Sequence, residues 1–201
     1  MKLYDANAGN AKRVRIFIAE KNIKVPRKVV ELGKGTRSPE FLKLNSLGEV
    51  PVLELNDGRI LTDSIAICRY LDLIFPKKSL MGKEPFEQGH IEMWSQRMYS
   101  ELFLPIGLMV RHQLPLFADI LEQVPAFADT QRKIMPKKWK WLDQELVDGR
   151  EFIAGDKFTF ADVQGMTALT ISDIFDLSPP IECIHATKWA KAMRKRPSWK
   201  A

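Results

Sequence analysis

The chain has 201 residues, of which 45% are apolar and 28% are charged, a composition typical of a folded protein with one large or two small domains. It contains no apolar run of about 20 residues, the length that a membrane span requires, and its opening lacks the apolar stretch of a secretion signal. Cys68 and Cys183 belong to no CxxC pair, which excludes the usual disulfide frameworks and zinc sites. We therefore expect a cytoplasmic protein that holds no metal and contacts no membrane.

The net charge of +6 raises the question of nucleic-acid binding, because cationic surfaces attract phosphates. The basic clusters at 133–140 and 188–200 are interleaved with tryptophans and a methionine at helical spacing. This spacing indicates helices that pack on one face and expose basic residues on the other. We therefore expect no nucleic-acid partner, although the charge is compatible with a small anionic ligand.

The chain opens with alternating strand and helix patterns. Residues 1–4 predict a short strand, 11–22 a helix with one buried stripe, and 28–32 a second strand, which together form a βαβ unit with parallel strands. Ser38 then starts a short helix as its N-cap. Pro39 occupies the first helical position, where its missing N–H does no harm.

The next two strands form a hairpin. Residues 52–55 and 60–62 flank Asn-Asp-Gly, and these residue types tolerate the positive φ that a tight hairpin turn requires. A helix pattern follows over 64–75. The order of elements up to this point is therefore β-α-β-α-β-β-α.

Beyond this point the sequence shows helical patterns and no strand pattern. Two prolines and a glycine within 76–85 indicate a linker, which we place at 78–86, so we expect an α/β domain over 1–77 and an all-helical domain over 87–201. One helix start there is especially clear, because Thr159 is a good N-cap and Asp162 can accept a hydrogen bond from its N–H. This signal predicts a buried helix start without chemistry of its own.

Pro51 stands immediately before a strand in the segment Gly-Glu-Val-Pro-Val-Leu, residues 48–53. A residue without an N–H cannot complete the strand ladder there, so it belongs at an edge or a bend. A cis bond after Val50 would turn the chain and leave the N–H and C=O of Val50 open to a peptide.

Together and in this order, the βαβ start, the proline segment, the hairpin, the third helix and Phe-Thr-Phe-Ala-Asp-Val resemble a glutathione S-transferase over nearly the whole chain. The resemblance implies a thioredoxin-like N-terminal domain, an all-α C-terminal domain and a homodimer. It also implies a cis Val50-Pro51 bond, with Glu49, Val50 and Pro51 binding glutathione and the Val50 backbone pairing with its cysteinyl unit.

The resemblance further implies that Asp63 and Ser64, at the start of the third helix, hold the γ-glutamyl end of glutathione. A helix N-terminus presents unpaired N–H groups and about half a positive charge, so a carboxylate binds well beside the Ser64 hydroxyl. Asp63 can pair with the ligand's ammonium. Alternatively, either residue is only the helix cap. Lys34 and Arg37 lie in the loop that would face the glycyl carboxylate.

Transferases of this kind ionise the glutathione thiol, because the thiolate is the nucleophile. Lowering a thiol pKa by two units takes roughly 2.7 kcal/mol. The usual donor in the family is a Tyr, Ser or Cys just after the first strand, but residues 5–14 hold no hydroxyl or thiol, and Tyr4 belongs to the strand.

Two other groups can stabilise the thiolate in place of that donor. The N-terminus of the first helix can contribute up to about 2 kcal/mol. The Asn10 amide, or alternatively Asn7, can contribute about 1.5 to 3 kcal/mol. Asn10 is otherwise a turn residue or cap.

His112 is a further catalytic candidate. Residues 82–97 and 104–115 resemble a bacterial and fungal subgroup that also lacks the usual donor, in which a serine and a histidine of the helical domain hold a water. Gly107 aligns with that serine, and Arg111 and His112 lie near the histidine. A lone histidine near a helix end is also typical of packing or capping.

We therefore predict a transferase that uses glutathione as its co-substrate and attacks small apolar electrophiles. The electrophile would lie against apolar side chains of the helical domain that also fit an ordinary core, namely Met98, Leu102, Phe103, Leu108 and Met109. The alternative is a non-catalytic glutathione-binding or protein-interaction member of the same fold, since the donor position is empty. A maleylacetoacetate isomerase is a third possibility, but it would need a serine-rich opening at residues 6–11.

Overall fold

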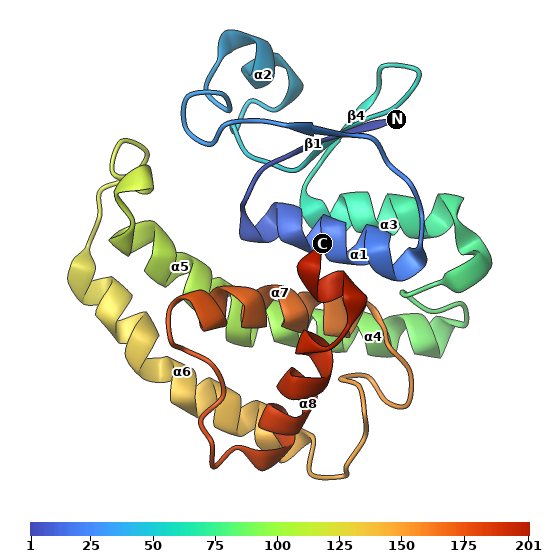
Figure 1. The fold of residues 1–201 in the computed structure, drawn as a ribbon, viewed down its shortest axis with the longest axis vertical. Coiled ribbons are helices and arrows are strands. Elements are labelled where there is room, and N and C mark those ends of the chain that lie inside the picture. The colour runs from blue at the N-terminus through green and yellow to red at the C-terminus, as the bar shows by residue number, and fades with distance from the viewer. The chain divides into compact units, whose positions relative to one another are not determined.

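The structure is a computed structural model that describes residues 1–201 and divides into two compact units. Unit 1 comprises Met1–Met81 together with Lys200–Ala201, and unit 2 comprises Gly82–Trp199 (Figure 1). The chain therefore passes from one unit to the other within the segment 78–86.

Unit 1 contains a four-stranded mixed sheet with helices on both of its faces (Figure 1). Its elements in chain order are β1 (Lys2–Asp5), α1 (Gly9–Lys21), β2 (Arg27–Val29), α2 (Pro39–Leu44), β3 (Val52–Glu54), β4 (Ile60–Thr62), α3 (Ser64–Ile74) and the 3-10 helix η1 (Pro76–Lys78). The strand order is β2-β1-β3-β4, with β1 parallel to β2 and antiparallel to β3, and β3 antiparallel to β4. The predicted thioredoxin-like order of elements is confirmed.

The second strand is shorter than the sequence suggested. It spans 27–29 rather than 28–32, because the chain leaves the ladder and enters turns in which Gly33 has a φ of 79°. Val30 and Leu32 instead pack against the hydrophobic cluster between the sheet and its covering elements. Val30 still donates its N–H to the C=O of Asp5 at 2.8 Å, so the pairing with β1 ends at this residue and the apolar character of Leu32 reflects packing.

The two faces of the sheet carry different helices. Tyr4 of β1 packs edge-on against Phe41 of α2, with 6.1 Å between the ring centroids. Leu3, the preceding residue, is fully buried and points to the opposite face, because side chains alternate along a strand. That face is covered by α1 and α3, which lie side by side (Figure 1). The starts of α1 and α3 are consequently neighbours.

The rest of the chain is helical, as predicted. Its elements are α4 (Pro85–Met98), the π-helix η2 (Tyr99–Phe103), α5 (Leu104–Gln113), the 3-10 helix η3 (Pro115–Phe117), α6 (Pro125–Glu145), α7 (Phe160–Ile174), α8 (Ile184–Arg194) and the 3-10 helix η4 (Pro197–Lys200). Extended backbone pairing is limited to one isolated bridge between Phe152 and Gly155. None of the helices combines the length and apolarity that crossing a membrane requires.

The helical run from α4 to α5 passes through η2 without a break. Pro105 lacks an N–H, and just before it the N–H of Leu104 donates to the C=O of Tyr99, five residues earlier, as in a widened turn. Met98, Leu102 and Met109 along this run are fully buried. Of the two interpretations offered by the sequence, ordinary core therefore describes these three residues.

The start of α7 has the predicted cap. The Asp162 carboxylate accepts hydrogen bonds from the N–H of Thr159 at 3.0 Å and from its hydroxyl at 3.3 Å. It also accepts from the N–H of Ile153 at 2.9 Å and from Nε1 of Trp189 at 3.0 Å. Asp162 is completely buried, and this burial raises its pKa to about 6. The helix start is therefore closed by groups of the chain itself.

Candidate functional site

The start of α1 has no side-chain cap. Its N-cap residue is Ala8, and its first turn, which begins with Gly9 and Asn10, contains no acidic residue. The first N–H groups of a helix have no partner within the helix, and the aligned peptide dipoles place about half a positive charge there. This end of α1 can therefore stabilise an anion that comes from outside the chain.

The start of α3 has a cap that uses only part of its carboxylate. Asp63, with a φ of 69°, accepts through Oδ1 from the N–H of Ile65 at 2.8 Å and from that of Ala66 at 3.4 Å. The capping role that we considered as an alternative is thus present. Asp63 is nevertheless exposed, and its Oδ2 accepts no hydrogen bond from the chain. One oxygen therefore remains for a cationic group.

Arg13 joins the two helix starts. Its Nη1 donates to Oδ1 of Asn10 at 2.7 Å and to Oγ of Ser64 at 2.5 Å. Arg13 and Ser64 are both buried, with 1% and 4% of their surfaces exposed. Two of the predicted site residues, far apart in the sequence, are thus brought to one guanidinium nitrogen.

Arg13 was not among the site residues predicted from the sequence. The residue lies three positions after Asn10 and four before Phe17, on the face of α1 that the structure buries. A charged residue on a buried helical stripe needs polar partners, and this is the signal that could have singled it out.

The segment before β3 supplies backbone groups. The Val50-Pro51 bond is cis, as the resemblance implied. The ladder between β1 and β3 reaches only to Val52, and the N–H and C=O of Val50 join no hydrogen bond within the chain. The preceding residue, Glu49, has an exposed side chain, while its C=O accepts from Nδ2 of Asn45 at 2.8 Å. Val50 therefore retains one donor and one acceptor for a ligand.

Arg37 lies beside this segment. A Cβ added to Gly48 would stand 3.1 Å from Nη1 of Arg37 and 2.8 Å from the C=O of Thr36, and Gly48 has a φ of 63°. Both the space and the backbone conformation therefore require glycine, and the close approach places the Arg37 guanidinium near Val50. Lys34, in the same stretch of turns, is exposed and makes no hydrogen bond or ion pair.

His112 lies in α5 of unit 2 and makes structural contacts. Its Nδ1 accepts a hydrogen bond from the N–H of Val124, the N-cap residue of α6, at 3.1 Å. Its ring meets that of Phe127 edge-on, with 5.0 Å between the centroids. Packing and capping, the alternative that we considered for His112, account for these contacts, and Nε2 remains without a hydrogen bond.

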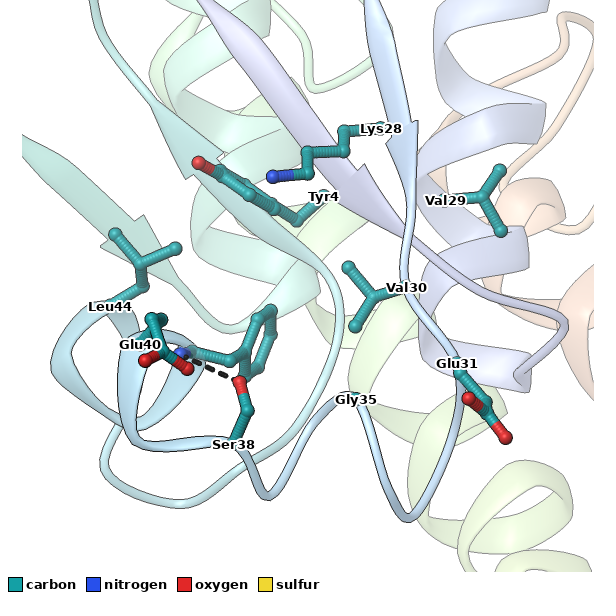
Figure 2. Close-up of a pocket in the computed structure, with 10 residues that line it drawn as sticks. Tyr4, Lys28, Val29, Val30, Glu31, Gly35, Ser38, Glu40 and Leu44 are labelled. Carbon is teal, nitrogen blue, oxygen red and sulfur yellow. Dashed lines mark hydrogen bonds between the residues drawn. The ribbon is translucent and has the colours of Figure 1, made fainter.

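Tyr4 faces away from the start of α1, as its position in the strand suggested. Its hydroxyl donates to Oε2 of Glu54 at 2.8 Å, and the Nζ of Lys28 lies 5.4 Å from the centroid of its ring. Figure 2 shows both side chains along a pocket between the sheet and α2. None of the predicted binding residues lines this pocket. Tyr4 is therefore not the missing thiol donor.

The structure thus gathers in unit 1 an open helix N-terminus, a second helix start with a hydroxyl and a carboxylate, and a backbone amide and carbonyl before β3. Residues 9–74 match the family model described as the N-terminal domain of glutathione S-transferases, and residues 98–197 match that of the C-terminal domain.

Glutathione S-transferase 2 of Saccharomyces cerevisiae is 36% identical over 206 aligned residues, which cover 100% of this chain and 88% of the relative. The crystal structure of Gtt2 from Saccharomyces cerevisiae is similar with a TM-score of 0.91 at 35% identity, covering 100% of this chain and 99% of that one. Elongation factor 1-gamma 3 of Oryza sativa subsp. japonica is 31% identical over 78% of this chain and 37% of its own length. The fold and these similarities show that the chain belongs to the glutathione S-transferase family.

Proposed function

We propose that the protein is a glutathione transferase that binds glutathione in unit 1 and activates its thiolate for attack on small apolar electrophiles. Members of the family use glutathione as a co-substrate. The observation that carries the proposal is the meeting of the α1 and α3 starts at Arg13, in the same unit as the free backbone groups of Val50. Dimerisation is typical of the family, and we infer a homodimer here as well.

The charges in unit 1 complement those of the tripeptide. The γ-glutamyl carboxylate binds at the N-terminus of α3 beside the Ser64 hydroxyl, and Oδ2 of Asp63 pairs with the adjacent ammonium. The cysteinyl unit exchanges backbone hydrogen bonds with Val50. The glycyl carboxylate faces Arg37, with Lys34 as a more distant cation. Each charged group of the ligand thus has a partner of opposite charge.

The thiolate is stabilised by the start of α1. The helix dipole contributes up to about 2 kcal/mol at a partly buried site, and a hydrogen bond from the amide of Asn10 about 1.5 to 3 kcal/mol. Together these exceed the roughly 2.7 kcal/mol that a two-unit fall in thiol pKa takes. The thiolate sulfur then forms a bond to the electrophilic carbon, and the leaving group departs with its electron pair.

Two measurements test the proposal. Immobilised glutathione should retain the protein under reducing conditions, and a chlorinated nitrobenzene should be converted to its glutathione conjugate with release of chloride. Asn10→Ala should lower kcat about tenfold, because it removes one of the two stabilising contributions. Failure of the unmodified protein both to bind glutathione and to form the conjugate would overturn the proposal. His112→Ala is a further test. If His112 is catalytic, its loss lowers kcat; if it only caps and packs, its loss lowers stability alone.

The second candidate is a non-catalytic glutathione-binding protein. It is favoured by the absence of a hydroxyl or thiol in residues 5–14 and by the similarity to an elongation factor 1-gamma. Titration calorimetry measures the binding of glutathione, and ultraviolet absorbance shows whether the bound thiol is ionised. Binding without thiolate absorbance at pH 7 indicates the non-catalytic protein. Thiol-disulfide exchange has no support, since Cys68 is buried within α3 and this burial raises the pKa of its thiol.

A further inference from the structure

We propose that Arg13 is a positioning residue that fixes the hydrogen-bond donors of Asn10 and Ser64 toward bound glutathione. The inference rests on the proposed function and assigns a role to a residue that touches neither the thiol nor the carboxylate in that proposal. Its basis is the pair of hydrogen bonds from one nitrogen, Nη1, to Oδ1 of Asn10 at 2.7 Å and to Oγ of Ser64 at 2.5 Å.

The chemistry of the guanidinium settles how the Asn10 amide is oriented. A guanidinium carries only donors, so the atom of Asn10 that faces it must be the carbonyl oxygen. The amide nitrogen with its two hydrogens then lies on the side of the amide group away from Arg13. Without Arg13 the amide could turn its oxygen toward the open end of α1, where it would repel a thiolate. Arg13 thus makes Asn10 a donor toward an anion.

The same reasoning applies to Ser64. A hydroxyl has one hydrogen and two acceptor sites, and the bond from Arg13 occupies an acceptor site. The hydroxyl hydrogen therefore remains to be donated elsewhere. A carboxylate at the N-terminus of α3 is an acceptor that can receive it. Arg13 thereby sets Ser64 as a donor to the γ-glutamyl carboxylate.

Burial makes this arrangement rigid. Arg13 exposes only 1% of its surface, in the layer where α1 packs against α3. Hydrogen bonds are stronger in such surroundings than in water, and a planar guanidinium holds two acceptors in fixed directions. A lysine at this position would keep the charge but present a flexible point donor in place of the planar fork.

Arg13→Lys and Arg13→Met test the proposal. Their readouts are the dissociation constant of glutathione and the thiol pKa of the bound tripeptide, followed by ultraviolet thiolate absorbance. We expect Arg13→Met to weaken binding about tenfold and to raise the thiol pKa by about one unit, the effect of losing one hydrogen bond to each charged group. Arg13→Lys should fall between this variant and the unmodified protein.

The matched control is Arg15→Lys. Arg15 lies on the same helix, is also buried, and pairs with the Asp5 carboxylate at 2.7 Å rather than with a predicted binding residue. It should change the melting temperature but leave both glutathione readouts unaltered. If Arg13→Lys behaves in the same way, the proposal is wrong. That control keeps the test decisive even where Arg13→Met fails to fold.

Double variants distinguish positioning from general support of the fold. If Arg13 acts on the thiol through Asn10, adding Arg13→Lys to Asn10→Ala raises the thiol pKa no further. Likewise, Arg13→Lys weakens glutathione binding less in the Ser64→Ala background than in the unmodified protein. Additive effects in both backgrounds contradict the proposal. Absence of glutathione binding by the unmodified protein would instead contradict the proposed function, and with it the role of Arg13.

Discussion

Both α3 and α7 have an aspartate in their capping motif, Asp63 as the N-cap of α3 and Asp162 in the first turn of α7, but the two carboxylates lie in opposite surroundings. Asp162 is fully buried and accepts four hydrogen bonds from the chain. Asp63 is exposed, and only its Oδ1 is used, by the N–H groups of Ile65 and Ala66. The start of α1 is more open than that of α3, because its N-cap is Ala8 and no side chain caps it.

This difference separates helix starts that support the fold from helix starts that can receive a ligand. At α7 both oxygens of the Asp162 carboxylate accept hydrogen bonds from the chain, so this carboxylate is fully used within the fold. At α1 the first helix N–H groups keep bonding capacity, and at α3 a carboxylate oxygen and a hydroxyl do, while Arg13 connects the two starts. Substitutions at the two kinds of start should therefore affect different properties.

The largest effect is expected for Asp162→Ala. The change leaves the N–H of Ile153, the N–H and hydroxyl of Thr159 and the indole N–H of Trp189 buried without an acceptor. We expect the free energy of unfolding to fall by about 3 to 5 kcal/mol. Urea unfolding followed by tryptophan fluorescence measures it, with Asp156→Ala on the exposed loop as control. A loss as small as that of the control would show that the cap is dispensable.

The pH dependence of stability should also differ between Asp162 and an uncharged replacement. Burial raises the pKa of Asp162 from 3.8 to about 6, so between these values the folded protein binds more protons than the unfolded chain. Stability therefore decreases as pH rises from about 4 to about 6 and is constant above that range, as far as this group contributes. Asp162→Asn lacks this contribution.

The measurement is the difference in unfolding free energy between the unmodified protein and Asp162→Asn across that range. The other carboxyl groups are common to both proteins and cancel in the difference. A difference that grows in favour of the unmodified protein with rising pH would mean that its hydrogen bonds outweigh its desolvation, contrary to this account.

Asp63→Asn should affect binding rather than stability. The amide oxygen can still accept from the N–H of Ile65, so the cap survives, but the negative charge facing the γ-glutamyl ammonium is lost. We expect glutathione to bind about tenfold more weakly, with the melting temperature nearly unchanged. Calorimetric titration and thermal unfolding give the two quantities. A stability loss without a change in affinity would identify Asp63 as a cap alone.

Ala8→Asp makes the start of α1 resemble that of α7. Ala8 has the extended backbone, φ −139° and ψ 151°, that an N-cap residue adopts, so an aspartate there can accept from the N–H groups of the first turn. We expect a gain of about 1 kcal/mol in stability together with a loss of transferase activity, since the new carboxylate occupies the place of the thiolate. A gain in stability with full activity would place the thiolate elsewhere.

Local signals in the sequence predicted much of the fold. The caps at Ser38 and Thr159 and the turn at residues 56–58 depend on neighbours in the chain, and each appears where it was expected. The end of β2 was misjudged, because the hydrogen bonds to β1 stop at Val30 while the apolar run continues to Leu32, which only packs. The cis Val50-Pro51 bond followed from family resemblance, since the residues around a proline leave both isomers open.

The candidate site was only partly predictable. Residue types and order pointed to Val50, Asp63 and Ser64, but the bridge made by Arg13 depends on how α1 packs against α3. His112 illustrates the same limit, since its hydrogen bond to the N–H of Val124 joins residues on separate helical segments. Contacts of this kind arise from tertiary structure and leave no local pattern in the sequence.

The central claim is that the open start of α1, with Asn10, holds glutathione as a thiolate. Ultraviolet titration of the protein with saturating glutathione measures it directly, with Asn10→Ala run in parallel. We predict a bound thiol pKa about two units below the ordinary value of about 8.5, and a pKa closer to that value in Asn10→Ala. Bound glutathione that titrates at the ordinary value in both proteins would contradict the account.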